Sequence, residues 1–387
     1  MTRREWKMIY FDNSATTKPY PEALATYTEV ASKIWGNPSS LHNLGSQATR
    51  ILEASRKQIA SLLGKKAEEI YFTSGGTEGD NWAIKGVAFE KAPYGKHIIV
   101  SAIEHPAVKE SALWLQGQGF EVDIAPVDAR GFVQVEELEK LLRPDTTLVS
   151  IMAVNNEVGS IQPIQAIADL LADRPTITFH VDGVQALAKV STALYLPERV
   201  DLATFSSHKF HGLRGVGFLY LKEGKKISPL LTGGGQEKDL RSTTENLAGI
   251  AATAKALRLA MERQEDFERK CHQLKEVIRE ELANYPDVTV FSGDEGFAPH
   301  ILTFGIKGVR GEVIVHAFEE YEIYISTTSA CSSKAGKPAG TLIAMGVEKA
   351  LAQTAVRLSL DLENDMSQVE QFLTKFKLIY EKTRKVR

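Results

Sequence analysis

Short runs rich in β-branched and aromatic residues alternate with longer amphipathic runs between residues 70 and 221. The short runs predict strands at residues 70–73, 97–101, 121–124, 147–153, 177–181, 202–206 and 216–221. The longer runs predict helices at residues 77–91, 107–118, 136–142 and 164–171. This alternation is typical of an α/β fold with a mainly parallel sheet, here of seven strands. Ligands of such sheets bind beyond the carboxyl ends of the strands.

The flanking segments have a different pattern. Two helices are expected before the first strand, at residues 21–34 and 47–63, and a long charge-rich helical stretch follows the sheet at residues 248–284. The remaining runs predict a smaller α+β domain, with strands at 288–291, 301–305, 323–326 and 356–360 and helices at 311–321, 341–345 and 366–384. We expect residues 15–257 to form the large domain, and residues 1–14 and 258–387 to form the small one.

Composition narrows the classes of function. The 387 residues carry a formal net charge of -3, which argues against a mainly electrostatic nucleic-acid binder. No apolar run approaches the roughly 20 residues of a membrane span, and the first residues lack the apolar stretch of a secretory signal, so we expect a cytoplasmic protein. Cys271 and Cys331 are too few for a disulfide framework or a four-cysteine metal site, and no metal is expected.

A glycine-rich turn follows the first strand of this pattern. Gly75, Gly76 and Thr77 lie between a predicted strand and a predicted helix, where free N–H groups and the positive helix end favour a phosphate. The spacing matches neither a dinucleotide fingerprint nor a P-loop. An ordinary strand-to-helix turn explains these residues equally well when they are considered alone.

Acid, amide and imidazole groups follow other strands. Asp182 ends a strand and can keep a pyridine nitrogen protonated, while Gln185 could reach the phenolic oxygen of the same ring. His105 follows another strand and can stack on a flat cofactor or transfer protons, and Asn155 offers amide donors. Taken singly, Asp182 is better explained as a helix N-cap, and His105 could be a packed loop histidine.

Lys209 lies between a predicted core strand and a glycine-rich turn. A lysine there is costly unless it is used or paired, and one use is a Schiff base with an aldehyde cofactor such as pyridoxal phosphate (PLP). Ser206 and His208 beside it supply donors suited to a phosphate. A solvated turn lysine is the alternative for this stretch alone, but five functional strand ends on one sheet edge favour a cofactor site.

Several stretches combine these residues with others in one characteristic order: residues 12–17, 36–40, 74–78, 104–105, 154–157, 180–182, 206–209, 233–237, 241–246, 329–333 and 356–360. In this respect the chain resembles a cysteine desulfurase of the NifS/IscS group, within the class V aminotransferase-like, fold-type I PLP enzymes. The match extends over nearly the whole chain. It departs from the usual pattern at Thr243 and Thr328, each in place of a glycine, and at Asp361, where glycine usually follows Ser-Leu.

The resemblance implies a role for each candidate residue. Lys209 would bind PLP covalently and His105 would stack over its ring. Asn37 would lie near the substrate, Arg357 would bind the substrate carboxylate, and Cys331 would be the nucleophile that takes the sulfur. The cofactor would also be held by Thr244 from the partner subunit of a homodimer. The residues of the sheet edge that would hold it are Gly76, Thr77, Asn155, Asp182, Gln185, Ser206, His208 and Lys209.

The activity implied is the conversion of L-cysteine to L-alanine, with the sulfur held as a Cys331 persulfide. An acceptor protein, either an iron–sulfur scaffold or a tRNA-thiolating enzyme, would then receive it, and the sequence does not choose between the two. Two alternatives remain: a selenocysteine lyase that uses the same residues, and a catalytically idle scaffold. The idle scaffold is disfavoured because the expected catalytic residues are intact.

Overall fold

The computed structural model describes residues 8–328 and 340–384. Its strands are β1 (Ile9–Tyr10), β2 (Ile70–Thr73), β3 (His97–Ser101), β4 (Glu121–Ala125), β5 (Thr146–Met152), β6 (Thr178–Asp182), β7 (Leu202–Ser206), β8 (Gly217–Leu221), β9 (Val288–Val290), β10 (Ile301–Ile306), β11 (Ile323–Tyr324), β12 (Ser326–Thr327) and β13 (Ala355–Ser359). Its α-helices are α1 (Pro21–Lys33), α2 (Asn43–Leu62), α3 (Gly76–Lys91), α4 (Pro106–Gln116), α5 (Val135–Leu141), α6 (Ile164–Leu170), α7 (Leu247–Glu262), α8 (Gln264–Leu282), α9 (Gly311–Glu319), α10 (Gly340–Ala344), α11 (Lys349–Ala352) and α12 (Met366–Arg384). Short 3₁₀ turns are η1 (Ala67–Glu69), η2 (Thr192–Leu194) and η3 (Ser207–Lys209).

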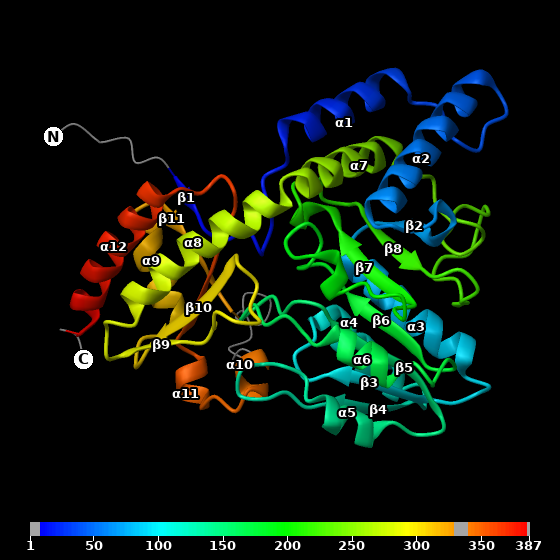
Figure 1. Cartoon of the computed structure of the whole chain (residues 1–387). Coiled ribbons are helices and arrows are strands. Elements are labelled where there is room, and N and C mark those ends of the chain that lie inside the picture. Colours follow the sequence, from blue (N-terminus) through cyan, green and yellow to red (C-terminus); the bar gives the residue numbers. More distant parts are fainter. Residues whose placement is uncertain (1–7, 329–339, 385–387) are drawn as a thin grey trace.

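A seven-stranded sheet of order β2-β8-β7-β6-β5-β3-β4 forms the larger group of elements (Figure 1). Within it only β8 runs antiparallel to its neighbours, so the other strands share one direction. The α/β fold with a mainly parallel seven-stranded sheet is therefore confirmed. All of these parallel strands end at one edge, where the turns that follow them meet.

Helices cover both faces of this sheet because its strands are apolar on both sides. In β3, for example, Ile98 and Val100 belong to one buried cluster with Trp82 of α3, while Ile99 points to the opposite cluster. This opposite cluster, which includes Leu52 of α2, is called the first core below. Strands buried on both faces are the expected partners of helices in an α/β fold.

A second core lies in the smaller group of elements at the left of Figure 1. A four-stranded antiparallel sheet, β12-β13-β10-β9, packs there against α8, α9 and α12, and β1 pairs in parallel with β11. Ile9 and Phe11 belong to this core, whereas Tyr20 belongs to the first one. These memberships support a division of the chain near residue 14, while the division expected near residue 258 stays a prediction.

Two elements differ from expectation. The stretch 248–284 is not one helix, because α7 packs on the first core and α8 on the second, and the chain turns at Arg263 between them. The strand expected at 323–326 is split, since β11 pairs with β1 while β12 pairs with β13.

No helix within residues 8–328 and 340–384 combines the length and the apolar character that crossing a bilayer requires.

The two threonines that replace family glycines cause no backbone conflict. Neither Thr243 nor Thr328 has a positive φ angle, so neither position needs the conformational freedom of glycine.

Candidate active site

Lys209 ends the short turn η3 directly after β7. Its Nζ donates hydrogen bonds to the main-chain oxygens of Ser14 and Ala15, at 2.6 and 2.9 Å. The hydroxyl of Thr17 donates to the main-chain oxygen of His208 and accepts from the N–H of His211, at 2.9 and 2.8 Å. The N-terminal segment therefore fixes the backbone on both sides of Lys209 and lies against its amine.

Asp182 and His105 lie close enough to Lys209 to influence one another electrostatically. Burial raises the pKa of Asp182, and the charges of His105 and Lys209 oppose that rise. Burial lowers the pKa of His105. Its Nδ1 accepts the Ala107 N–H at 3.1 Å, so a neutral ring carries its proton on Nε2. The site thus combines a carboxyl group, a neutral imidazole and an amine.

The N-terminus of α3 forms a cradle beside these groups. Gly75 at the N-cap has a φ of 154° and offers no side chain to the first N–H groups of the helix. A Cβ on Gly76 would lie 2.9 Å from Val184 Cγ2 and 3.5 Å from Ser206 Cβ, so this turn packs closely against the ends of β6 and β7. His208 directly precedes Lys209, and burial together with the Lys209 charge lowers its pKa to about 4.

Gln185 connects a buried lysine to the same segment. Its Nε2 donates to the Ser14 main-chain oxygen at 2.9 Å, and its Oε1 accepts from Lys189 Nζ at 3.2 Å. Burial, with Lys209 as the next cause, lowers the pKa of Lys189 to about 7. Lys189 is not among the predicted site residues, although it follows Gln185 by four residues in the sequence.

Arg357 extends from β13 of the smaller group and is almost fully buried. Its guanidinium donates to the Asn156 main-chain oxygen at 2.7 Å and to Asp12 Oδ1 at 2.9 Å. Its Nε has no hydrogen-bond partner among the described residues. Burial raises the pKa of Asp12 despite the neighbouring Arg357. Asp12 was known only as part of a matching stretch, and this pairing was not predicted.

Asn155 is buried after β5, but its amide is already occupied. Its Nδ2 donates to the Ile103 main-chain oxygen and to the Thr341 hydroxyl, and its Oδ1 accepts the N–H groups of Glu157 and Val158. Asn155 therefore ties three segments together. Direct contact of this amide with a cofactor stays a prediction.

Three of the predicted site residues are not found at this sheet edge among the described residues of the single chain. Asn37 is exposed in the connection between α1 and α2, where its Oδ1 accepts the Ser39 N–H. Thr244 is also exposed and lines a surface pocket with Ser74 and Arg241. Cys331 lies outside the described residues.

Two buried acids behind the sheet edge were also missed. Burial raises the pKa of Glu104 to about 8, while its Oε1 accepts from the Ser101 hydroxyl and the Met152 N–H. Burial and the nearby Asp182 raise the pKa of Asp80 strongly. Glu104 therefore holds a proton near neutral pH. The signal of both acids in the sequence was weak, since each is one carboxylate among many.

Comparison with known proteins identifies the family. The family model described as Aminotransferase class-V matches residues 9–372. The chain is 54% identical over 380 residues to a "NifS/IcsS protein homolog" of Lactobacillus delbrueckii subsp. bulgaricus, covering 98% of this chain and 99% of the relative. It is 40% identical over 380 residues to the "Cysteine desulfurase IscS" of Methanosarcina thermophila, covering 98% and 94%.

Solved structures agree with these matches. A structure described as "NIFS-LIKE PROTEIN" superposes with a TM-score of 0.90 at 38% identity, covering 98% of this chain and all of that one. Enzymes of this family depend on PLP. The chain therefore belongs to the class V aminotransferase family, in the group of the NifS/IscS cysteine desulfurases.

Proposed function

We propose that the protein is a PLP-dependent cysteine desulfurase that converts L-cysteine to L-alanine and passes the sulfur, through Cys331, to an acceptor protein. The observation that carries this proposal is the electrostatic grouping of Lys209, Asp182 and His105 at one sheet edge, beside the start of α3. An amine can form a Schiff base with a pyridine aldehyde, a carboxyl group can pair with its ring nitrogen, and a neutral imidazole can transfer protons beside it.

The residues present fit PLP. The uncapped start of α3 offers N–H groups and a positive helix end to the phosphate, next to Thr77, Ser206 and His208. The close packing at Gly76 leaves no space for a Cβ there. The Lys209 amine would bind the aldehyde, and Asp182 would hold a proton on the ring nitrogen. Gln185 has a second amide N–H that it can offer to the phenolic oxygen.

When bound, PLP supplies an electron sink for the carbon that loses a proton. The protein's own groups do the rest. Arg357 would bind the substrate carboxylate, with its Nε as a donor that is buried and has no partner among the described residues. His105, neutral because burial lowers its pKa, covers the site and donates through Nε2. Because Asp182 and Arg357 are buried, little water reaches them, and each electrostatic contact that they make is stronger.

Cys331 takes the sulfur in the proposed reaction. Its thiolate attacks the substrate sulfur, the new S–S bond forms as the carbon–sulfur bond breaks, and the electron pair of that bond returns to the carbon, which takes up a proton to give alanine. The role of Cys331 rests on the sequence stretch 329–333. The choice between an iron–sulfur scaffold and a tRNA-thiolating enzyme as acceptor stays a prediction, as does a cytoplasmic location.

A homodimer is part of the proposal. Large apolar side chains are exposed on α1, on α2 and in the connection between them, among them Trp35, Leu41 and Leu44. Such side chains are typical of an interface. Asn37 lies in the same connection and Thr244 is exposed on the single chain, as expected of residues that serve a partner subunit.

The two cysteines provide a matched test of the reaction. Cys271 is fully buried and burial raises its pKa far above the usual range, so it is an inert thiol. With a dithiol reductant present to release the persulfide sulfur as sulfide, we expect Cys271→Ala to form alanine and sulfide from L-cysteine like the wild type. Cys331→Ser should retain bound PLP but release no sulfide. Wild-type sulfide release by Cys331→Ser would contradict the proposal. Turnover of selenocysteine by Cys331→Ser, without turnover of cysteine, would favour a selenocysteine lyase.

A further inference from the structure

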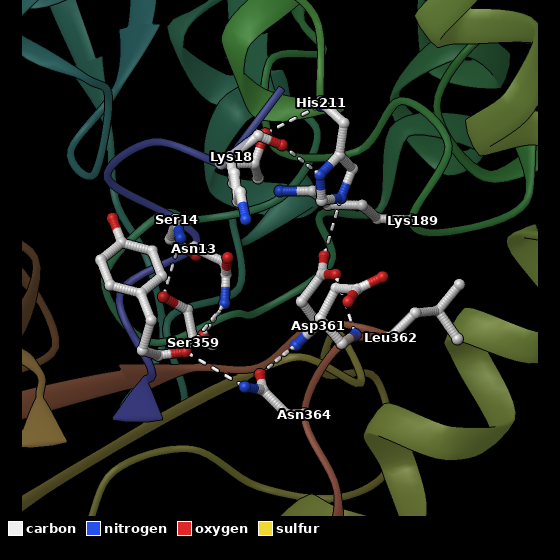
Figure 2. A network of polar contacts seen from close by, with 12 residues as sticks. Asn13, Ser14, Lys18, Lys189, His211, Ser359, Asp361, Leu362 and Asn364 are labelled. Atoms are coloured by element: carbon white, nitrogen blue, oxygen red, sulfur yellow. Dashed lines mark hydrogen bonds and ion pairs between the residues drawn. The ribbon is translucent and has the colours of Figure 1, made fainter. Parts of the chain in front are cut away.

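A buried acid and a buried histidine meet between the two groups of elements. Asp361 Oδ2 lies 2.9 Å from His211 Nε2, and the two side chains are the centre of the network in Figure 2. Both residues are buried, Asp361 with 3% and His211 with 8% of its surface exposed. The His211 ring also stacks on Tyr20, with ring centroids 4.2 Å apart.

The hydrogen-bond partners define where the protons lie. His211 Nδ1 is 2.8 Å from the Lys18 main-chain oxygen, which can only accept, so Nδ1 carries a proton. The Asp361 carboxylate faces Nε2, and one proton must lie between these two groups for the contact to be favourable. Removing either side chain would leave the other buried without its partner, which is costly.

The strand geometry explains why Asp361 faces the site. Side chains of an extended chain alternate between its two faces. Val356, Leu358 and Leu360 therefore point into the second core. Arg357 and Asp361 lie on the opposite face, as does Ser359, whose hydroxyl accepts the Ser14 N–H at 2.7 Å. One face of β13 and its continuation thus carries the guanidinium and the carboxylate together.

His211 lies close to Lys209, the residue proposed to bind PLP. It follows Lys209 by two residues, with a φ of 64°, a conformation that is uncommon for residues other than glycine. The Tyr20 N–H donates to its main-chain oxygen at 3.0 Å. Lys209, His211 and Asp361 also line one small cavity of about 10 Å³. The contact therefore joins the turn of Lys209 to the strand of Arg357.

We propose that Asp361 and His211 form a positioning pair that sets the distance between Lys209 and Arg357, and with it the fit of the substrate carboxylate. The inference rests on the proposed function, in which Lys209 binds the cofactor and Arg357 binds the carboxylate of the substrate. The pair does not touch the substrate. It acts by holding β13 at a fixed distance from η3.

The test compares Asp361→Ala and Asp361→Asn with Glu363→Gln, a control that alters an exposed carboxylate two residues away. We expect Asp361→Ala to raise KM for L-cysteine about tenfold, with PLP affinity unchanged by absorbance titration. The side-chain amide introduced by Asp361→Asn can still hydrogen-bond to a neutral imidazole, so we expect an intermediate KM for that variant. It also serves as the test variant if the alanine variant is too unstable. Glu363→Gln should behave like the wild type.

A double-mutant cycle separates positioning from general destabilisation. If the pair acts through Arg357, then Asp361→Ala should add less than about twofold to KM in an Arg357→Ala background. An unchanged KM in both Asp361 variants, or a full additional increase in the Arg357→Ala background, would overturn the inference. Arg357→Ala alone tests the proposed function, because it must raise KM whether or not Asp361 matters.

Discussion

Arg357 combines a buried charge with a donor that has no protein partner among the described residues. Asp12 and the Asn156 main-chain oxygen accept from two of its nitrogens, whereas the buried Nε makes no hydrogen bond to them. We expect Arg357→Ala to raise KM for L-cysteine. The increase should correspond to a loss of about 2 kcal/mol in the free energy of substrate binding, the value of a lost charged hydrogen bond. Steady-state kinetics on L-cysteine measures this change.

Arg357→Lys is the matched control for this prediction. Lysine keeps the charge but not the fork of donors, so it should recover only part of the loss. A wild-type KM in Arg357→Ala would contradict the assigned role.

At this scale, a residue that directly follows one strand can be placed at a sheet edge from the sequence. Asp182, His105 and Lys209 could be selected because each comes after an apolar run, and the structure gathers them at one edge. Pairs that join distant segments could not be predicted in this way. Nothing in the sequence pairs Asp361 with His211, or Asp12 with Arg357, since these contacts depend on how the second core meets the first.

At the scale of elements, the start of α3 is the most constrained part of the proposed cofactor site. A Cβ on Gly76 would come within 2.9 Å of Val184 Cγ2, so Gly76→Ala must displace the Val184 side chain, the helix start or the turn after β6. We expect this variant to bind PLP at least about tenfold more weakly, because the phosphate contact depends on this geometry. Absorbance titration with PLP measures the affinity.

A second substitution provides the control for this prediction. Val184→Ala removes the atom that the new Cβ would strike, so the double variant Gly76→Ala/Val184→Ala should recover most of the affinity. If Gly76→Ala binds PLP like the wild type, the phosphate does not lie at this helix end.

The elements themselves were largely predictable, because local patterns determine them. The strands β2, β3 and β7 have the expected bounds, since their apolar runs end at clear turns. The break at Arg263 was missed because both halves of the stretch have helical periodicity, and only packing on two different cores separates them. The split between β11 and β12 likewise depends on strand pairing, which local patterns do not specify.

At the scale of the whole molecule, the exposed apolar side chains near α1 and α2 are the basis for the proposed dimer. Trp35 is 72% exposed and Leu41 is fully exposed on the single chain. We expect Trp35→Asp and Leu41→Asp to weaken a dimer by about 2 kcal/mol or more, because a charge at the centre of an apolar interface is costly. Sedimentation over a concentration series measures the change.

Tyr94 offers a matched control, since it is 82% exposed at a different place in the fold. Tyr94→Asp should leave the oligomeric state unchanged. A wild-type protein that remains monomeric at high concentration would contradict the dimer.

The central claim is that Lys209, rather than a neighbouring amine, binds PLP. Lys189 is the competing group, because it is buried nearby and its pKa is about 7. The most direct measurement is borohydride reduction of the PLP-loaded protein, followed by mass analysis of its peptides. We predict that the reduced cofactor is found on Lys209 in the wild type and in Lys189→Met, and is absent from Lys209→Ala. Label on Lys189 or another lysine, or a covalent adduct retained by Lys209→Ala, would contradict the account.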